Sequence, residues 1–113
     1  MTVDDFLEKL NSTPEKINFS ELMDVIEQHY SFTPTAFENG DLHNDMGENS
    51  GSCKLFSFAK LNGLSVEQTL ACFGTYYRED VLQNPEAEDH QNIRNFMKRG
   101  WAGISFDQPA LAE

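Results

Sequence analysis

The chain has 113 residues, of which 39% are hydrophobic and 24% are charged; this suits one domain with its own core and excludes a chain disordered throughout. The formal net charge is −11, and residues 1–50 carry most of it, with eleven acids and two bases. Because an acidic surface repels phosphate groups, we expect no nucleic-acid partner and no docking on an anionic membrane.

Two amphipathic helices are predicted in the first third of the chain. Apolar residues recur on one helical face over residues 3–10, and Thr2 can cap this helix. Asn18 and Glu21 form a capping-box pair at the start of a second helix, which continues to about residue 30.

A long polar segment separates these helices from the rest of the chain. Residues 31–38 favour an extended conformation, and Pro34 confines such a strand to a sheet edge. The Asn39-Gly40 turn signal opens a polar loop that reaches Ser52 and has almost no apolar side chains. Loops of this length are usually functional or disordered, and we expect this one to be an ordered surface anchored to the last helix.

Two more helices are expected after this loop. Ser52 can cap a helix that is apolar on nearly every side, and Gly63 ends it. Ser65 and Gln68 form a further capping box, and the helix that they open is predicted to continue to residue 84. Gly74 lies inside this pattern, which a close helix crossing would explain.

Asp89 is expected to cap a fifth helix, which Gly100 closes. An alternating apolar pattern predicts a short strand over residues 101–106, paired antiparallel with residues 32–38, followed by a frayed tail. The predicted fold is therefore mainly α, at the margin of α+β, with about five helices and this one strand pair in a single domain of residues 1–113. The core is expected to contain Leu22, Ile26, Phe37, Leu55, Phe56, Phe58, Ala59, Leu70, Phe73, Tyr77, Ile93, Phe96, Met97 and Trp101.

The polar loop begins like a calcium-binding loop but does not continue as one. Asp41, His43 and Asp45 alternate as possible ligands, yet Met46 and Ser52 stand where that motif requires Gly and Glu. No cysteine pair has zinc-finger spacing either, so we expect no metal site and no cofactor.

The two cysteines, Cys53 and Cys72, are expected to be reduced thiols of a cytoplasmic protein, because no secretory signal precedes them. Cys53 would lie in the first turn of a helix, where the helix dipole lowers the pKa of a thiol and favours a nucleophile. Cysteines in apolar helices are more often packing residues, and that interpretation is preferred.

His90 and Arg94 lie four residues apart, on one face of the predicted last helix and beside Asn95. They could bind a ligand together with the polar loop, or they could simply hold that loop in place, and the second interpretation is preferred. The candidate ligand-binding residues are Asn39, Asp41, His43, Asn44, Asn49, Ser52, Cys53, His90, Arg94 and Asn95.

Five sequence blocks together resemble a known family. They are FTPTAFENG (32–40), NSGSCK (49–54), FAKLNGL (58–64), LACFGTYYR (70–78) and DHQNIRNF (89–96), with Gly100-Trp101. Over about residues 15–111 the chain is similar to the HopJ-type family of type III effector proteins. The resemblance implies a bacterial protein that a type III system can inject into a host cell, and it implies no catalytic residue.

These observations favour an effector-like protein that acts by binding another protein. The alternative is a small-molecule or metal-ion binding protein, or a hydrolytic enzyme, whose site lies where residues 38–53 meet His90, Arg94 and Asn95.

Overall fold

Helices make up most of the regular structure in the computed structural model, which describes all residues from 1 to 113. The α-helices are α1 (Val3–Ser12), α2 (Phe19–His29), α3 (Ser50–Leu61), α4 (Val66–Ala71) and α5 (Gln91–Arg99). Three short helical turns are η1 (Pro14–Lys16), η2 (Tyr76–Val81) and η3 (Gly100–Gly103). The strands are β1 (Ser31–Phe32), β2 (Phe37–Asn39), β3 (Leu42–Asn44), β4 (Ile104–Phe106) and β5 (Leu111–Ala112). None of the helices has the length and apolar character that a membrane span requires.

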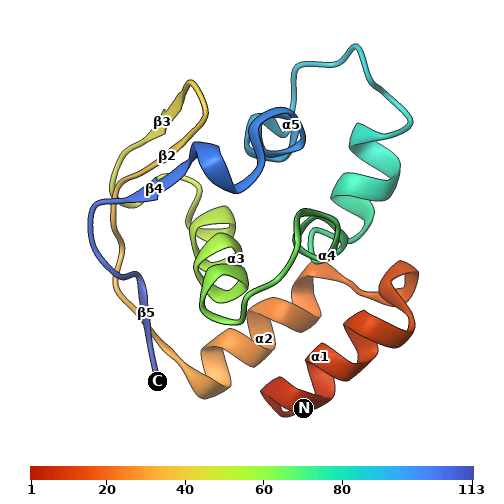
Figure 1. Ribbon diagram of the computed structural model, residues 1–113, viewed down its shortest axis with the longest axis vertical. Coiled ribbons are helices and arrows are strands. Elements are labelled where there is room, and N and C mark those ends of the chain that lie inside the picture. Colours follow the sequence, from red (N-terminus) through yellow and green to blue (C-terminus); the bar gives the residue numbers. More distant parts are fainter.

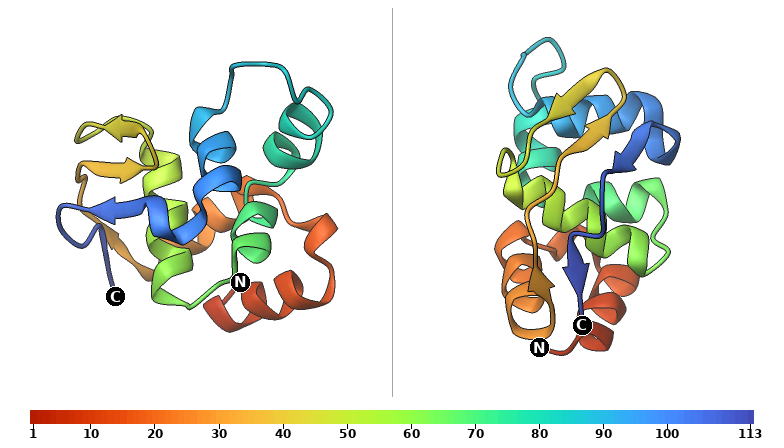
Figure 2. Two further views of the ribbon diagram at one scale, coloured as in Figure 1. Left: turned by 45° about the horizontal axis from the view of Figure 1, so that its top comes forward. Right: turned by 90° about the vertical axis from the view of Figure 1, so that its left-hand side faces the viewer.

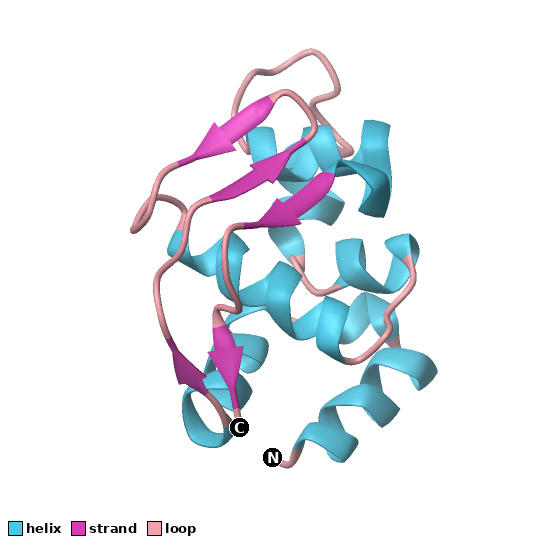
Figure 3. Ribbon diagram, turned by 60° about the vertical axis from the view of Figure 1, so that its left-hand side comes forward, coloured by secondary structure: helices cyan, strands magenta, loops and turns pink.

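Helix α3 lies at the centre of the molecule, with α1 and α2 below it and the sheet of β2, β3 and β4 to one side (Figure 1). When the sheet is viewed from its outer face, helices α4 and α5 lie behind it (Figure 2, right). The two termini lie close together at one end, where the short β1–β5 pair also sits (Figure 3).

The starts of α1, α2 and α4 follow directly from local sequence. Thr2 accepts a hydrogen bond from Asp5 N–H at 3.0 Å, and Glu21 accepts one from Asn18 N–H at 3.1 Å. The Ser65 hydroxyl likewise accepts from Gln68 N–H at 3.1 Å. Each contact satisfies a backbone group that the helix itself leaves unpaired, so these predicted starts are confirmed.

The predicted strand pair is present in part. β2 pairs antiparallel with β4, with Phe37 opposite Phe106 and Asn39 opposite Ile104, whereas residues 101–103 form the helical turn η3. The prediction of a frayed tail is wrong, because β5 pairs with β1 and places Leu111 opposite Phe32. Burial of the Leu111 side chain against the core holds the tail in place.

The polar loop is also more regular than predicted. β3 pairs with β2, so residues 37–44 form a hairpin that completes a sheet in the order β3-β2-β4. Helix α3 begins at Ser50, which puts Ser52 inside its first turn and not at the cap. Asn49 occupies the cap of α3, and His90 takes the cap of α5 that was expected of Asp89. The fold is therefore α+β and not mainly α.

The core is one cluster of 21 buried hydrophobic residues around α3. The ring of Phe56 packs against the rings of Phe37, Phe73, Phe96 and Trp101. The predicted core is confirmed except at Met97, which is 42% exposed, while Tyr77 and Trp101 are partly buried. Met97 lies outside because the buried face of α5 includes Asn92 in place of Met97. A prediction from apolar residues alone does not expect a buried asparagine.

The predicted fourth helix is interrupted at Gly74, which has a φ of +63°. α4 ends at Ala71, and the chain continues as a separate helical turn, η2, from Tyr76. A Cβ on Gly74 would lie 3.0 Å from the backbone nitrogen of Phe19 and 3.1 Å from the carbonyl oxygen of Ile17. The expected close approach therefore exists, and it joins this turn to the start of α2.

Comparing Gly74→Ala with Gly63→Ala separates the cost of backbone strain from the cost of a steric clash with neighbouring backbone. Both glycines have a φ of +63°, but nothing lies within 4 Å of a Cβ on Gly63. We expect Gly63→Ala to cost about 1–2 kcal/mol of unfolding free energy through strain alone. Gly74→Ala is expected to cost about 1–3 kcal/mol more, because rigid backbone must move. Urea denaturation measures both variants, and equal losses would contradict the close approach.

Candidate functional site

A cavity of about 410 Å³ lies between the N-termini of α3 and α5, and its size is typical of small-molecule sites. Asn49, Gly51 and Ser52 line it from the start of α3. His90 and the first turn of α5 line it from the other side. The remaining wall is apolar or aromatic and consists of Phe19, Leu42, Phe73 and Tyr76.

The two helices that open on this cavity start differently from the others. Their N-cap residues, Asn49 and His90, have φ angles of 50° and 51° and are the two non-glycine residues with positive φ. Neither side chain caps its own helix, whereas α1, α2 and α4 all have capping boxes. Positive φ costs an L-residue energy and persists only where surrounding contacts impose it.

Backbone N–H groups are consequently free at both helix starts. The first hydrogen bond of α3 runs from Cys53 N–H to Asn49 O at 2.9 Å, which leaves residues 50–52 without a helical acceptor. In α5 the first such bond is donated by Ile93 N–H to His90 O at 3.0 Å. Because Gly51, Ser52 and residues 91–92 line the cavity, these donors lie at its wall.

Acidic side chains are missing where this chain usually places them. The first turns of α1, α2 and α4 contain an acid, while those of α3 and α5 contain none. The 11 lining residues include no Asp or Glu, although the chain has 19 acids. A helix N-terminus carries about half a positive charge. Two of them without an acid in the first turn make the cavity favourable for an anion, although Asp80 and Asp89 lie 3.1 and 3.9 Å from His90 Nε2.

Four asparagines hold the two helix starts and the hairpin together. The Nδ2 group of Asn39 donates to Asn92 O at 2.7 Å, and that of Asn92 donates to Asn44 Oδ1 at 3.0 Å. Asn49 Nδ2 donates to the same Asn44 oxygen at 2.7 Å. Asn39, Asn44 and Asn92 are buried, and the oxygen Oδ1 of Asn39 has no partner. The network therefore fixes the cavity wall from behind.

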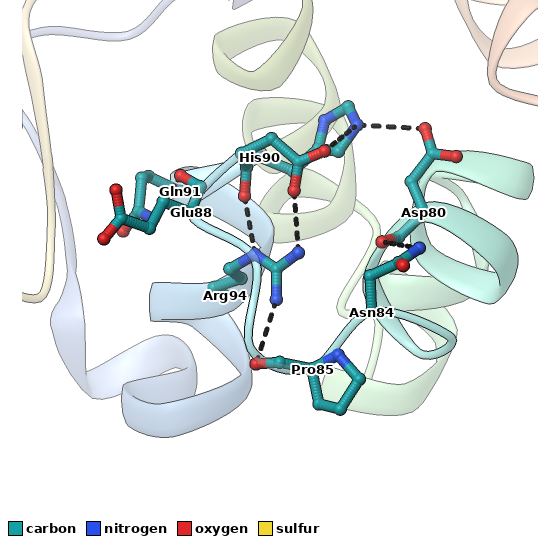
Figure 4. Close-up of polar contacts among 8 residues, drawn as sticks. Asp80, Asn84, Pro85, Glu88, His90, Gln91 and Arg94 are labelled. Carbon is teal, nitrogen blue, oxygen red and sulfur yellow. Dashed lines mark hydrogen bonds and ion pairs between the residues drawn. The ribbon is translucent and has the colours of Figure 1, made fainter.

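His90 connects the cavity to η2 (Figure 4). Its Nε2 lies 3.1 Å from Asp80 Oδ2, and its ring centre lies 5.3 Å from that of Tyr76. The carboxylate and the neighbouring ring hold the imidazole in one orientation at the cavity wall. Tyr76 is thus a wall residue of the cavity as well as a support for His90.

Arg94 fastens the segment before α5, as Figure 4 shows, and it does not contact the polar loop of residues 38–53. Its Nε donates to Asp89 O at 2.6 Å and one terminal nitrogen donates to Asp89 Oδ1 at 2.7 Å, while the other donates to Pro85 O at 3.4 Å. The Arg94 guanidinium holds the pKa of Asp89 below its usual range. Arg94 therefore holds the segment before its own helix, and not the polar loop as expected.

Comparison with known proteins assigns the chain to a family. The family described as "HopJ type III effector protein" matches residues 3–111. The chain belongs to the HopJ family. It is also 59% identical to a protein of unknown function, VPA0580, whose crystal structure it matches with a TM-score of 0.98 over 99% of this chain and 93% of that one. No curated protein matches the chain.

The residues that we predicted for a site in this HopJ-family chain divide into three groups. Asn49, Ser52 and His90 line the cavity, and Asn39 and Asn44 support it from behind. Arg94 and the remaining candidates lie elsewhere, so the structure does not bring the ten residues into one site. The candidates outside the cavity are Asp41, His43, Cys53, Arg94 and Asn95.

Three of these outer candidates lie on the surface. Asp41 pairs with Arg99 at 3.1 Å where both side chains are exposed, which contributes little to stability. Asn95 Nδ2 donates to the carbonyl of Gln91 at 3.0 Å, within α5. His43 lies between Glu38 and Asp45 on the hairpin. No group of three His, Cys, Asp or Glu side chains is placed to hold a metal ion.

The cysteines do not have the environment of nucleophiles. Both are buried, and burial raises the pKa of Cys53 and raises that of Cys72 to about 12. A high pKa keeps the thiol protonated at neutral pH. The hypothesis of a hydrolytic enzyme that uses Cys53 is therefore not supported, and the preferred interpretation as packing residues describes both cysteines.

Sequence reasoning missed most of the cavity wall. Phe73 was predicted as a core residue, and Phe19, Leu42 and Gln91 were not among the predicted site residues. One signal could have identified the site: in a chain rich in acids, the segments NSGSCK and HQNIRN open helices without an acid in the first turn. The αL conformation of Asn49 and His90 has no comparable local signal.

The His43 contacts predict a pH-dependent hairpin. Its hydrogen bond with Glu38, followed by that with Asp45, raises the pKa of His43 above its ordinary 6.5. Since the folded pKa is the higher one, this contribution to stability is complete below about pH 6.5 and is lost as the pH rises through the folded value. NMR titration is expected to give a raised pKa that Glu38→Gln lowers. Glu48→Gln is the control and should leave it unchanged, because it removes a charge from a side chain that bonds to Asp45 N–H and not to His43.

Proposed function

We propose that this HopJ-family protein binds a small organic phosphate, a phosphate group joined to an aromatic or apolar body, in the cavity between α3 and α5. One observation carries the proposal: two helix N-termini with no side-chain cap and no acid in the first turn face one cavity. Together they supply about one positive charge and several free N–H donors. A phosphate has the charge and the acceptor oxygens that such donors match.

The rest of the wall favours a ligand with an organic body. Phe19, Phe73 and Tyr76 offer apolar and aromatic surface beside the helix starts. Ser52 and the amides of Asn49 and Gln91 add neutral hydrogen-bonding groups, which suit an ester or sugar portion. No hydrogen bond joins Ser52 to His90, so we propose binding and assign no catalytic step. Synthesis in the bacterial cytoplasm and delivery into a host cell through a type III system belong to this proposal.

Phenyl phosphate is a suitable probe for the cavity. We expect it to shift the amide NMR signals of residues 50–52 and 91–92 saturably. Ser52→Asp is expected to weaken this binding more than about tenfold, because it places a negative charge at the site. The same aspartate in the first turn of α3 should raise the melting temperature, because it complements the helix dipole. Loss of binding would then not result from unfolding.

Ser20→Asp is the matched control. Ser20 is exposed in the first turn of α2 and does not line the cavity, so the same charge there should leave binding unchanged. Equal weakening by both variants would indicate a general charge effect, and phenyl phosphate that shifts no signals in the wild-type protein would refute the proposal.

A second candidate function is protein binding along a groove between η2 and α5. Leu82 is 49% exposed and Met97 is 42% exposed, and both line this groove of about 370 Å³. Two large apolar side chains from different elements at one groove are typical of an interface. The net charge of −11 favours a partner whose surface is basic around an apolar centre.

Cross-linking in host-cell lysate tests this second function. We expect a partner to be captured by the wild-type protein and lost with the double variant Leu82→Glu, Met97→Glu, because charges at the groove prevent apolar contact. Met46→Glu is the control, since Met46 is 67% exposed and lies on the hairpin side. A partner retained by the double variant would exclude the groove as the interface.

A further inference from the structure

A second cavity, of about 560 Å³, lies between α3 and the segment that joins β4 to β5. This segment passes along α3 before its last residues pair with β1, as Figures 1 and 3 show. Ser57, Lys60 and Leu61 line the cavity from the second half of α3. The opposite wall consists of Phe106, Asp107, Gln108, Pro109, Ala110 and Leu111. It shares no residue with the cavity at the helix starts.

The Ser57 side chain gives this cavity a polar group without a strong partner. Ser57 is 6% exposed, and its hydroxyl has no nitrogen or oxygen atom within hydrogen-bond distance; the Cys53 thiol, one turn earlier on α3, is its one polar neighbour and is a weak hydrogen-bonding group. A buried hydroxyl that lacks a strong partner is unfavourable. Because Ser57 lines the cavity, a polar atom of a bound molecule could supply the missing partner.

Lys60 adds a free positive charge to the same wall. The chain has 19 acids and 8 lysines and arginines, yet none of its ion pairs involves Lys60. Its ammonium group instead lies 5.7 Å from the centre of the Phe106 ring. An ammonium beside an apolar wall is suited to a carboxylate whose organic body covers that wall.

The charge of the cavity disfavours a doubly charged ligand. Asp107 also lines it, so the side-chain charges of the wall sum to zero. A doubly charged phosphate would therefore meet one cation and one carboxylate, without the free helix N–H groups of the first site. A single carboxylate needs only one cationic partner.

We infer that the cavity between α3 and residues 106–111 binds a small monocarboxylate with an apolar body. Its carboxylate pairs with Lys60, its apolar part packs on Leu61 and Phe106, and the Ser57 hydroxyl bonds to an oxygen of the ligand. The site is independent of the proposed phosphate site, and either can fail without the other.

Hydrocinnamate is the probe, followed by amide NMR. It is expected to shift the signals of residues around Ser57 and Leu111 saturably and to leave those of residues 50–52 unchanged. Lys60→Met keeps the apolar stem and removes the charge, and is expected to weaken binding about tenfold. Ser57→Ala is expected to weaken it about fivefold through the lost hydrogen bond.

Lys54→Met is the matched control. Lys54 lies on the same helix with its ammonium 4.9 Å from the centre of the Phe32 ring, and it does not line the cavity. It should bind hydrocinnamate like the wild type. The inference is overturned by any one of three results: no saturable shifts at this cavity, equal weakening by the two lysine variants, or equal binding of the uncharged amide, hydrocinnamamide.

Discussion

The contact among Asn39, Asn44, Asn92 and Asn49, of which the first three are buried, is the constraint on which the rest of the site depends. Asn49 would ordinarily cap α3, but its side-chain nitrogen donates to Asn44 instead, at 2.7 Å. With its amide turned toward Asn44, Asn49 does not place its Oδ1 to accept from the first N–H groups of α3. The residue takes a φ of 50°, and the start of α3 is left open. The cavity thus results from how the hairpin is attached to the helices.

The same contact fixes the register of the hairpin. A slip of one residue would turn Asn39 and Asn44 to the solvent face and bring Glu38 and His43 inward. A buried amide that loses its partner costs more folding free energy than its hydrogen bond contributes. The network therefore destabilises the wrong register as much as it stabilises the right one. The unpaired oxygen of Asn39 is a cost that remains in this arrangement.

The sequence predicted correctly those features of the fold that depend on contacts between residues close together in the chain. The starts of α1, α2 and α4 each depend on a hydrogen bond between residues three apart, which a sequence pattern displays directly. β3 and the caps of α3 and α5 depend on asparagine contacts across as many as 53 residues, which no window of the sequence contains. The turn at Gly74 is similar, because the start of α2 imposes it. The family resemblance, in contrast, rested on blocks spread along the chain and is confirmed.

The central position of α3 explains why the chain has two cavities of different chemistry. Its first turn presents free N–H groups and no acid, so one end carries the positive side of a helix dipole. Its second half presents Ser57 and Lys60 among apolar residues, where a single ammonium is the source of positive charge. Between these ends, Cys53, Leu55 and Phe56 are buried almost completely and hold the helix rigidly in the core. One rigid helix can therefore serve two recognition surfaces without being remodelled, because each uses a different part of its length and neither requires it to move.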